Sequence, residues 1–132
     1  MGLVRGYLLV VGVLFYLPFG ALLLVDPAGM FARMGMPLGS AMAIEEVRAS
    51  HGGVWVLTGL LCIAAVWCRR WIRYVLVFLL ILNGGFAIGR LVSLAIGAVP
   101  VMQIVPLLGV DLVLLLISIG ALTKVEFPQG KD

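Results

Sequence analysis

The chain has 132 residues, of which 64% are hydrophobic and 11% are charged, and its mean hydropathy is +1.24. A soluble domain of this size needs far more polar surface, because apolar area must be hidden from water, so the composition excludes a water-soluble protein. The formal charge of +3 does not indicate a nucleic-acid partner, because the basic residues lie at the ends of apolar segments and form no patch. The lipid bilayer is the expected solvent and partner.

Four apolar segments follow one another along the chain, each long enough to cross a hydrocarbon core of about 30 Å. Backbone amides in lipid must be satisfied within their own segment, and no segment alternates apolar and polar residues as a membrane β-strand does. We therefore expect an all-α integral membrane four-helix bundle with antiparallel up-down topology, in which residues 1–132 form a single domain. The expected spans are 6–25, 40–67, 74–99 and 101–122.

The first span ends at Asp26, and Pro18 inside it is expected to kink the helix. The linker 26–40 carries Pro and Gly at both ends, so we expect a loop with a short interfacial helix, followed by Ser40 as the cap of the second span. Methionine thioethers in and near this loop are soft ligands for Cu(I), but flexible apolar contact with the interface is the favoured interpretation, and no metal site is expected. These methionines are Met30, Met34, Met36 and Met42.

The turn WCRRWIRY between the second and third spans gathers arginines and aromatic residues, a combination that suits a membrane interface. Placing this turn in the cytoplasm puts six of the nine basic residues inside, so the positive-inside rule favours both termini in the cytoplasm. Cys62 and Cys68 fall on opposed faces of a helix, so we expect small packing residues and neither a disulfide nor a metal pair. The inside set is Arg5, Arg69, Arg70, Arg73, Lys124 and Lys131.

The second span opens with EEVRASHGG, which places carboxylates, a guanidinium and the only histidine at the mouth of an apolar helix. At about 100° per residue, most of these groups share one face, which continues into the bilayer. The Gly52–Gly53 pair beside the histidine would let a ligand approach the backbone or would pack helices, and packing is favoured. The shared face comprises Glu45, Arg48, His51, Gly52, Trp55, Thr58, Gly59 and Cys62.

Each of the last two spans also has one polar face. In the third span, Gly85–Gly89 forms a GxxxG step that permits close helix approach. We expect the polar faces of the last three spans to turn toward each other in the outer half of the membrane. Those of the third and fourth spans comprise Asn83, Phe86, Arg90, Ser93 and Gly97, and Gln103, Leu107, Asp111 and Ser118.

Charge balance explains how ionisable residues persist in lipid, where an Asp or Arg at a helix centre costs about 2.5–3.5 kcal/mol. Counted at about 1.5 Å per residue from the outer ends of their spans, Arg90 and Asp111 reach depths of about 12 Å and about 15 Å. We predict an Arg90–Asp111 ion pair and, from the i, i+3 spacing, a Glu45–Arg48 pair.

Neutralisation alone does not explain why these charges are present, because apolar replacements are often no less stable than a buried ion pair. A binding site is the favoured interpretation; the alternatives are charges that only fix helix register and an interface with a partner protein. For His51, hydrogen-bonded packing competes with proton transfer, which its unperturbed pKa of about 6.5 suits. The candidate ligand-binding residues are Glu45, Arg48, His51, Trp55, Asn83, Phe86, Arg90 and Asp111.

The segment EEVRASHGG, the sequence GRLVSL and the acidic residue of the fourth span resemble a group of small four-span bacterial membrane proteins of unknown function. That group has an acidic-x-x-Arg-Ala-x-x-Gly-Gly opening and an arginine in the third span. A more distant resemblance is to DoxX-like four-helix proteins, some of which are linked to quinone-coupled oxidation or membrane redox complexes. The likeness rests on Glu45, Arg48, Gly53 and Arg90 and assigns no catalytic residue.

We therefore expect a multi-pass bacterial inner-membrane protein that binds a quinone- or lipid-like molecule, as an accessory subunit of a membrane redox complex. The alternatives are a proton-coupled transporter acting as a dimer, with Glu45, His51 and Asp111 relaying protons, and a structural assembly factor. An enzyme is not favoured, because no nucleophile, metal set or phosphate loop appears. Beyond a quinone or lipid no cofactor is expected, and the assemblies considered are a homodimer and a larger membrane complex.

Overall fold

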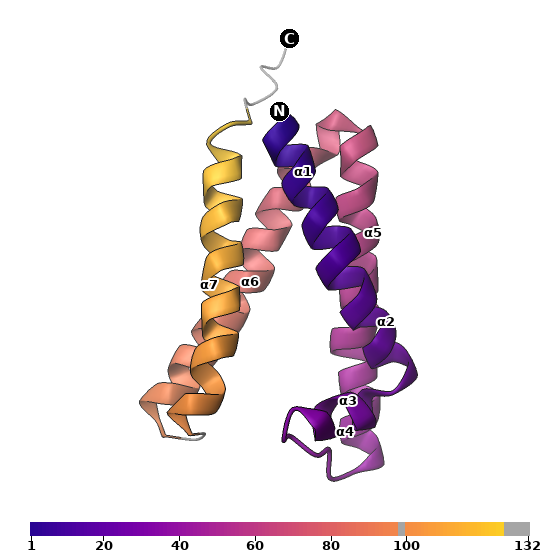
Figure 1. Cartoon of the computed structure of the whole chain (residues 1–132), viewed down its shortest axis with the longest axis vertical. Coiled ribbons are helices and arrows are strands. Elements are labelled where there is room, and N and C mark those ends of the chain that lie inside the picture. Colours follow the sequence, from indigo (N-terminus) through magenta and orange to yellow (C-terminus); the bar gives the residue numbers. More distant parts are fainter. Residues whose placement is uncertain (98–99, 126–132) are drawn as a thin grey trace. The chain divides into compact units, whose positions relative to one another are not determined.

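The computed structural model of the chain describes residues 1–97 and 100–125. Four of its helical segments are long and apolar enough to cross a membrane, namely Gly2–Val25, Ala41–Trp67, Arg69–Ala95 and Val101–Leu122. No strand occurs among the described residues, so the prediction of an all-helical chain with four candidate membrane spans is confirmed. Figure 1 follows these helices along the chain.

Two of the spans contain a π-helical turn, in which the helix widens by one residue. The first comprises α1 (Gly2–Val10), the π-turn η1 (Val11–Tyr16) and α2 (Leu17–Val25), and the linker after it forms α3 (Pro27–Arg33). The second comprises α4 (Ala41–Val47), the π-turn η2 (Arg48–Gly53) and α5 (Val54–Trp67). The third and fourth comprise a 3-10 turn η3 (Arg69–Trp71), α6 (Ile72–Ala95) and α7 (Val101–Leu122).

The ends of these helices follow local signals in the sequence. Ser40 caps α4, because its Oγ accepts a hydrogen bond from the Ala43 N–H at 3.1 Å, as predicted. The short helix expected in the linker is α3. The third span ends earlier than expected, because Gly97 adopts a φ of +65°, the left-handed conformation that stops a helix, just after α6. The expected end of that span at 99 lies outside the described residues.

Residues Gly2–Arg69 form one compact unit, the N-terminal hairpin, in which α1, η1 and α2 pack against η2 and α5. Glycines set the separation of these helices. A Cβ added to Gly12 would lie 3.0 Å from the Gly59 carbonyl oxygen, and one added to Gly20 would lie 2.6 Å from the Val56 nitrogen. The backbones of the first and second spans are therefore in direct contact, the packing that small residues permit between membrane helices.

The same contact continues at Gly52, where an added Cβ would lie 2.9 Å from the Leu24 nitrogen. The packing interpretation of the glycine pair is thus confirmed for Gly52. The π-turn η1 precedes Pro18, and the Leu17 N–H reaches back five residues to the Gly12 carbonyl oxygen. Because proline crowds the carbonyl four residues earlier, this wider turn gives its ring room, and the expected distortion takes this form.

The described residues from Arg70 to Val125 form the second compact unit, the C-terminal hairpin, in which α6 packs against α7. The Gly85–Gly89 step does not mediate the contact within this hairpin, because a Cβ at either glycine would meet no atom of α7 within 4 Å; its role in close helix approach stays a prediction. Gly85 lies about 200° around the helix from Asn83, and Gly89 lies about 200° from Ala87. The buried Asn83 and Ala87 occupy the packed face instead. In the fourth span, Asp111 and Ser118 are buried as expected, whereas Gln103 and Leu107 are exposed.

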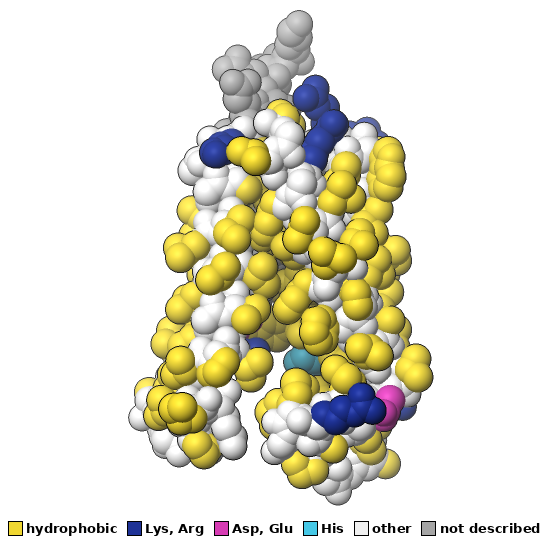
Figure 2. All heavy atoms as spheres, viewed as in Figure 1, with side chains coloured by type: hydrophobic (Ala, Val, Ile, Leu, Met, Phe, Trp, Pro, Cys, Tyr) yellow, Lys and Arg dark blue, Asp and Glu magenta, His cyan; other side chains and the backbone are white. Residues whose placement is uncertain are grey.

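Apolar side chains cover most of the helix surface in view in Figure 2, as a lipid solvent requires. On either side of the turn between α5 and α6, Trp67 at the end of α5 and Tyr74 in the first turn of α6 are 73% and 70% exposed, which suits the predicted aromatic belt. Cys62 is buried in the N-terminal hairpin, as expected of a packing residue, but Cys68 is exposed because it follows the last turn of α5. Each hairpin is described by itself, and the single four-helix bundle stays a prediction.

Candidate functional site

The C-terminal hairpin carries an ion pair between its apolar helices. Arg90 on α6 donates from Nε to Oδ2 of Asp111 on α7 at 2.8 Å, which confirms the predicted pair. The Asp111 side chain is 8% exposed and that of Arg90 is 26% exposed. The opposite charges cancel, the condition under which ionisable groups persist in apolar surroundings.

The guanidinium of Arg90 is held on two sides and open on a third. Phe86 lies one turn earlier on α6, and its ring centroid is 5.9 Å from Arg90 Cζ, a cation–π distance. Among the described residues of the C-terminal hairpin, neither Nη group of Arg90 has an acceptor, and Oδ1 of Asp111 has no donor. The pair therefore presents hydrogen-bond donors beside an acceptor.

Other polar side chains within the spans bond to their own helices. Asn83, which is 2% exposed, donates from Nδ2 to the Leu79 carbonyl oxygen at 2.7 Å, four residues earlier. Such bonds satisfy a donor where no water is present, so they explain how these residues persist without requiring a ligand. The same i, i−4 bond is made by Thr58, Ser93 and Ser118.

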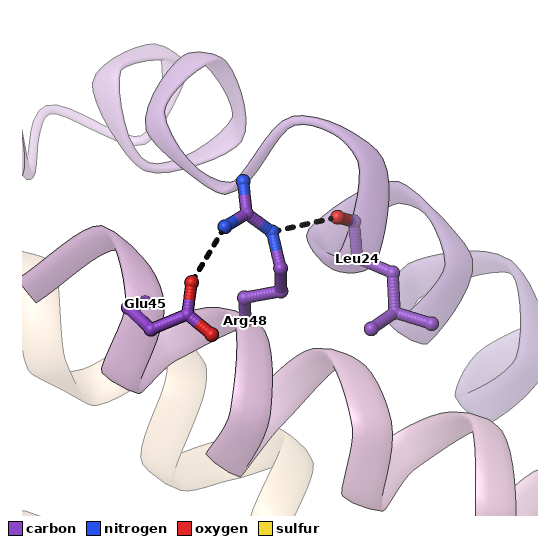
Figure 3. Close-up of polar contacts among 3 residues, drawn as sticks. All are labelled: Leu24, Glu45 and Arg48. Carbon is purple, nitrogen blue, oxygen red and sulfur yellow. Dashed lines mark hydrogen bonds and ion pairs between the residues drawn. The ribbon is translucent and has the colours of Figure 1, made fainter. Parts of the chain in front are cut away.

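In the N-terminal hairpin, Arg48 joins both helices. Its Nη1 donates to Oε2 of Glu45 at 2.8 Å, the pair predicted from the i, i+3 spacing. Its Nε donates to the Leu24 carbonyl oxygen at 3.0 Å, as Figure 3 shows. Leu24 lies in the last turn of α2, where carbonyls lack helical partners and a positive charge complements the helix dipole. Arg48 thus caps the first span, a contact that helical spacing within the second span does not reveal.

His51 lies in the π-turn η2, and its neighbour Ser50 decides which ring nitrogen carries the proton. The Ser50 hydroxyl donates to the Glu46 carbonyl oxygen at 2.6 Å, which uses its only hydrogen. The Ser50 Oγ also lies 2.9 Å from Nδ1 of His51, so it must accept a hydrogen bond from that nitrogen. This arrangement favours the neutral tautomer that is protonated on Nδ1.

Aromatic rings extend from this histidine along the N-terminal hairpin. The His51 ring centroid lies 6.1 Å from that of Phe31 and 5.7 Å from that of Trp55. Trp55 continues the row by stacking on Phe15 at 5.7 Å, and Phe15 contacts Phe19 at 5.4 Å. Of these rings, His51 and Trp55 were predicted as part of the site. Phe15, Phe19 and Phe31 come from the first span and the linker, and their only sequence signal is their aromatic character.

The comparisons with known proteins give one match. A family model described as "Domain of unknown function (DUF4345)" matches residues 4–122. The chain belongs to the DUF4345 family. Comparison with curated proteins and with solved structures gave no match.

Membership in DUF4345 confirms the prediction of a family of unknown function, whereas the resemblance to DoxX-like proteins stays a prediction. The matched range includes every candidate ligand-binding residue of this DUF4345 chain. In the described part of the chain, no group of three or more His, Cys, Asp or Glu side chains is placed to hold a metal ion. The structure brings Arg90 together with Asp111, and His51 with Trp55; the ligand-binding role of all eight candidates stays a prediction.

Proposed function

We propose that this DUF4345 protein binds a small amphipathic molecule, quinone-like or lipid-like, in the outer half of a bacterial inner membrane. The observation that carries the proposal is the Arg90 guanidinium, which Asp111 and Phe86 hold while its Nη groups have no acceptor among the described residues of the C-terminal hairpin. Arginines within membrane spans persist where their donors find acceptors. A membrane-soluble molecule with carbonyl or other acceptor oxygens supplies them.

The roles in this proposal follow from the contacts. Arg90 orients the oxygens of the bound molecule, Asp111 positions Arg90, and Phe86 meets the apolar part. The other proposed ligand-binding residues are Asn83 in the same hairpin and, in the N-terminal hairpin, Glu45, Arg48, His51 and Trp55. The aromatic row beside His51 is the kind of apolar wall with few polar groups that binds such molecules. The distant likeness to DoxX-like proteins supports a place as an accessory subunit of a membrane redox complex.

The test compares the molecules that co-purify with the protein from native membranes in detergent-free lipid particles. Arg90→Met combined with Asp111→Leu removes both charges at once, so that neither is left unpaired. We expect one molecular class to be enriched over the bulk membrane with the wild-type protein and reduced roughly tenfold or more in the double variant, because charge-assisted hydrogen bonds contribute about 1.5–3 kcal/mol. Mass spectrometry of the extracts measures this.

Arg33→Gln is the matched control, because Arg33 is an exposed arginine at the end of α3. This variant should retain the enriched class. Helix content measured by circular dichroism must be equal in all three proteins. Identical inventories from the wild-type protein and the double variant would show that Arg90 binds no membrane molecule.

A further inference from the structure

The Arg90–Asp111 pair is neutral as a unit, and this restricts the charge of what it binds. The guanidinium contributes +1 and the carboxylate −1, and they share a single hydrogen bond of 2.8 Å between Nε and Oδ2. When an uncharged ligand binds, the net charge of the ion pair and its ligand stays at zero. An oxyanion would leave a net charge of −1 among apolar helices and would lie on the same guanidinium as the Asp111 carboxylate, where like charges repel.

The remaining hydrogen-bond groups of the pair specify the ligand further. Both Nη groups of Arg90 are donors, and Oδ1 of Asp111 is an acceptor; none has a partner among the described residues of the C-terminal hairpin. A ligand that satisfies the Arg90 donors and the Asp111 acceptor together must offer an acceptor oxygen beside a hydroxyl donor. Phe86 lies against the guanidinium at 5.9 Å, which favours approach along the hydrogen-bonding edge.

We propose that the Arg90–Asp111 pair selects an uncharged lipid-soluble molecule that carries a carbonyl oxygen next to a hydroxyl group, and excludes an anionic headgroup on the same apolar chain. The inference rests on the proposed function and specifies its ligand. The carbonyl accepts hydrogen bonds from Nη1 and Nη2 of Arg90, and the hydroxyl donates to Oδ1 of Asp111. Asp111 is then both the partner of Arg90 and the residue that determines specificity.

The experiment uses two photo-crosslinking probes with the same diazirine-bearing acyl chain, presented to the full-length protein in nanodiscs of zwitterionic lipid. One probe is a monoacylglycerol, which is uncharged and carries an ester carbonyl and hydroxyls. The other is an alkyl sulfonate, which is an anion at any working pH. We expect the wild-type protein to reach half-maximal labelling at an at least roughly tenfold lower mole fraction of monoacylglycerol than of sulfonate, one charge-assisted bond being worth about that factor.

Asp111→Asn provides the charge switch. It keeps the side-chain shape but leaves Arg90 with a net charge of +1, so the preference should reverse in favour of the sulfonate by roughly tenfold. Asp111→Glu keeps the carboxylate and should keep the monoacylglycerol preference. If Asp111→Asn fails to fold, the wild-type and Asp111→Glu comparisons still decide the question.

The outcomes separate the two proposals. Preferential labelling of the wild-type protein by the sulfonate, lost in Arg90→Met with Asp111→Leu, would overturn the inference while leaving an Arg90-dependent ligand site. Labelling by both probes that is equal in the wild-type protein and in this double variant would overturn the proposed function itself.

Discussion

Ser50 is a small, half-buried residue that the sequence analysis did not single out, yet its hydroxyl contacts the only histidine of the chain. Because the Ser50 hydrogen is used on the Glu46 carbonyl, its oxygen accepts from Nδ1 of His51. Ser50 and His51 both lie in the π-turn η2.

This assignment predicts a spectroscopic change in Ser50→Ala. At a pH where the imidazole is neutral, nitrogen NMR of histidine-labelled wild-type protein should show a protonated Nδ1 and an unprotonated Nε2. In Ser50→Ala, Nδ1 loses its acceptor and the Nε2-protonated tautomer should become populated. Ser50→Thr keeps the hydroxyl and should restore the wild-type spectrum. A wild-type ring protonated on Nε2 would contradict the hydrogen-bond assignment.

At the scale of helices, the N-terminal hairpin depends on glycines that allow backbone contact. Gly20→Ala would place a methyl group 2.6 Å from the Val56 nitrogen, which no rotamer change can relieve. We expect the free energy of unfolding of the hairpin to fall by about 1–3 kcal/mol, the usual cost of overpacking. Reversible denaturation in mixed micelles, followed by circular dichroism, measures the change.

Gly6→Ala is the matched control for this prediction, because Gly6 lies in the same span and an added Cβ would meet no atom within 4 Å. Alanine is the better helix former, so Gly6→Ala should leave stability unchanged or raise it by up to about 1 kcal/mol. Equal effects of the two substitutions would mean that the helices do not rest on each other at Gly20.

The sequence predicted the contacts that follow from spacing within one helix or from charge balance, and it missed those that depend on how two helices are rotated against each other. The Ser40 cap and the Glu45–Arg48 pair follow from spacing within one helix, and Arg90–Asp111 follows from charge balance and depth. The bond from Arg48 to Leu24 depends on the rotation of the first span against the second. No periodicity within either span encodes that rotation.

The absence of Gly85 and Gly89 from the α6–α7 contact has the same origin. A GxxxG step indicates that close helix approach is sterically allowed, but the remaining residues of the helix determine which face packs against the neighbouring helix. In α6 the packed face carries bulkier apolar residues, and burying these removes more apolar surface than burying glycines. Gly12 and Gly20, spaced by two turns and outside any GxxxG step, make the close contacts instead. The buried residues of α6 are Ile72, Val75, Leu76, Leu79, Asn83 and Ala87.

For the whole molecule, the positions of the basic residues predict which side of the membrane each turn faces. With both termini in the cytoplasm, the turn from Trp67 to Tyr74 is cytoplasmic, and the linker 26–40 faces outward. Arg69 and Arg70 in that turn are exposed. The same orientation assigns the Arg90–Asp111 pair to the outer half of the membrane, so it decides from which leaflet a ligand enters.

The native cysteines test this orientation without any tag. Cys68 is exposed beside Arg69, whereas Cys62 is buried, so a membrane-impermeant maleimide should report on Cys68 alone. We expect no labelling in intact spheroplasts of a bacterial host and full labelling after the membrane is disrupted. Ser40→Cys in a Cys68→Ser background should give the opposite pattern, because Ser40 ends the outward linker. Labelling of Cys68 in intact spheroplasts would invert the topology, and the ligand would then have to reach Arg90 from the cytoplasmic leaflet.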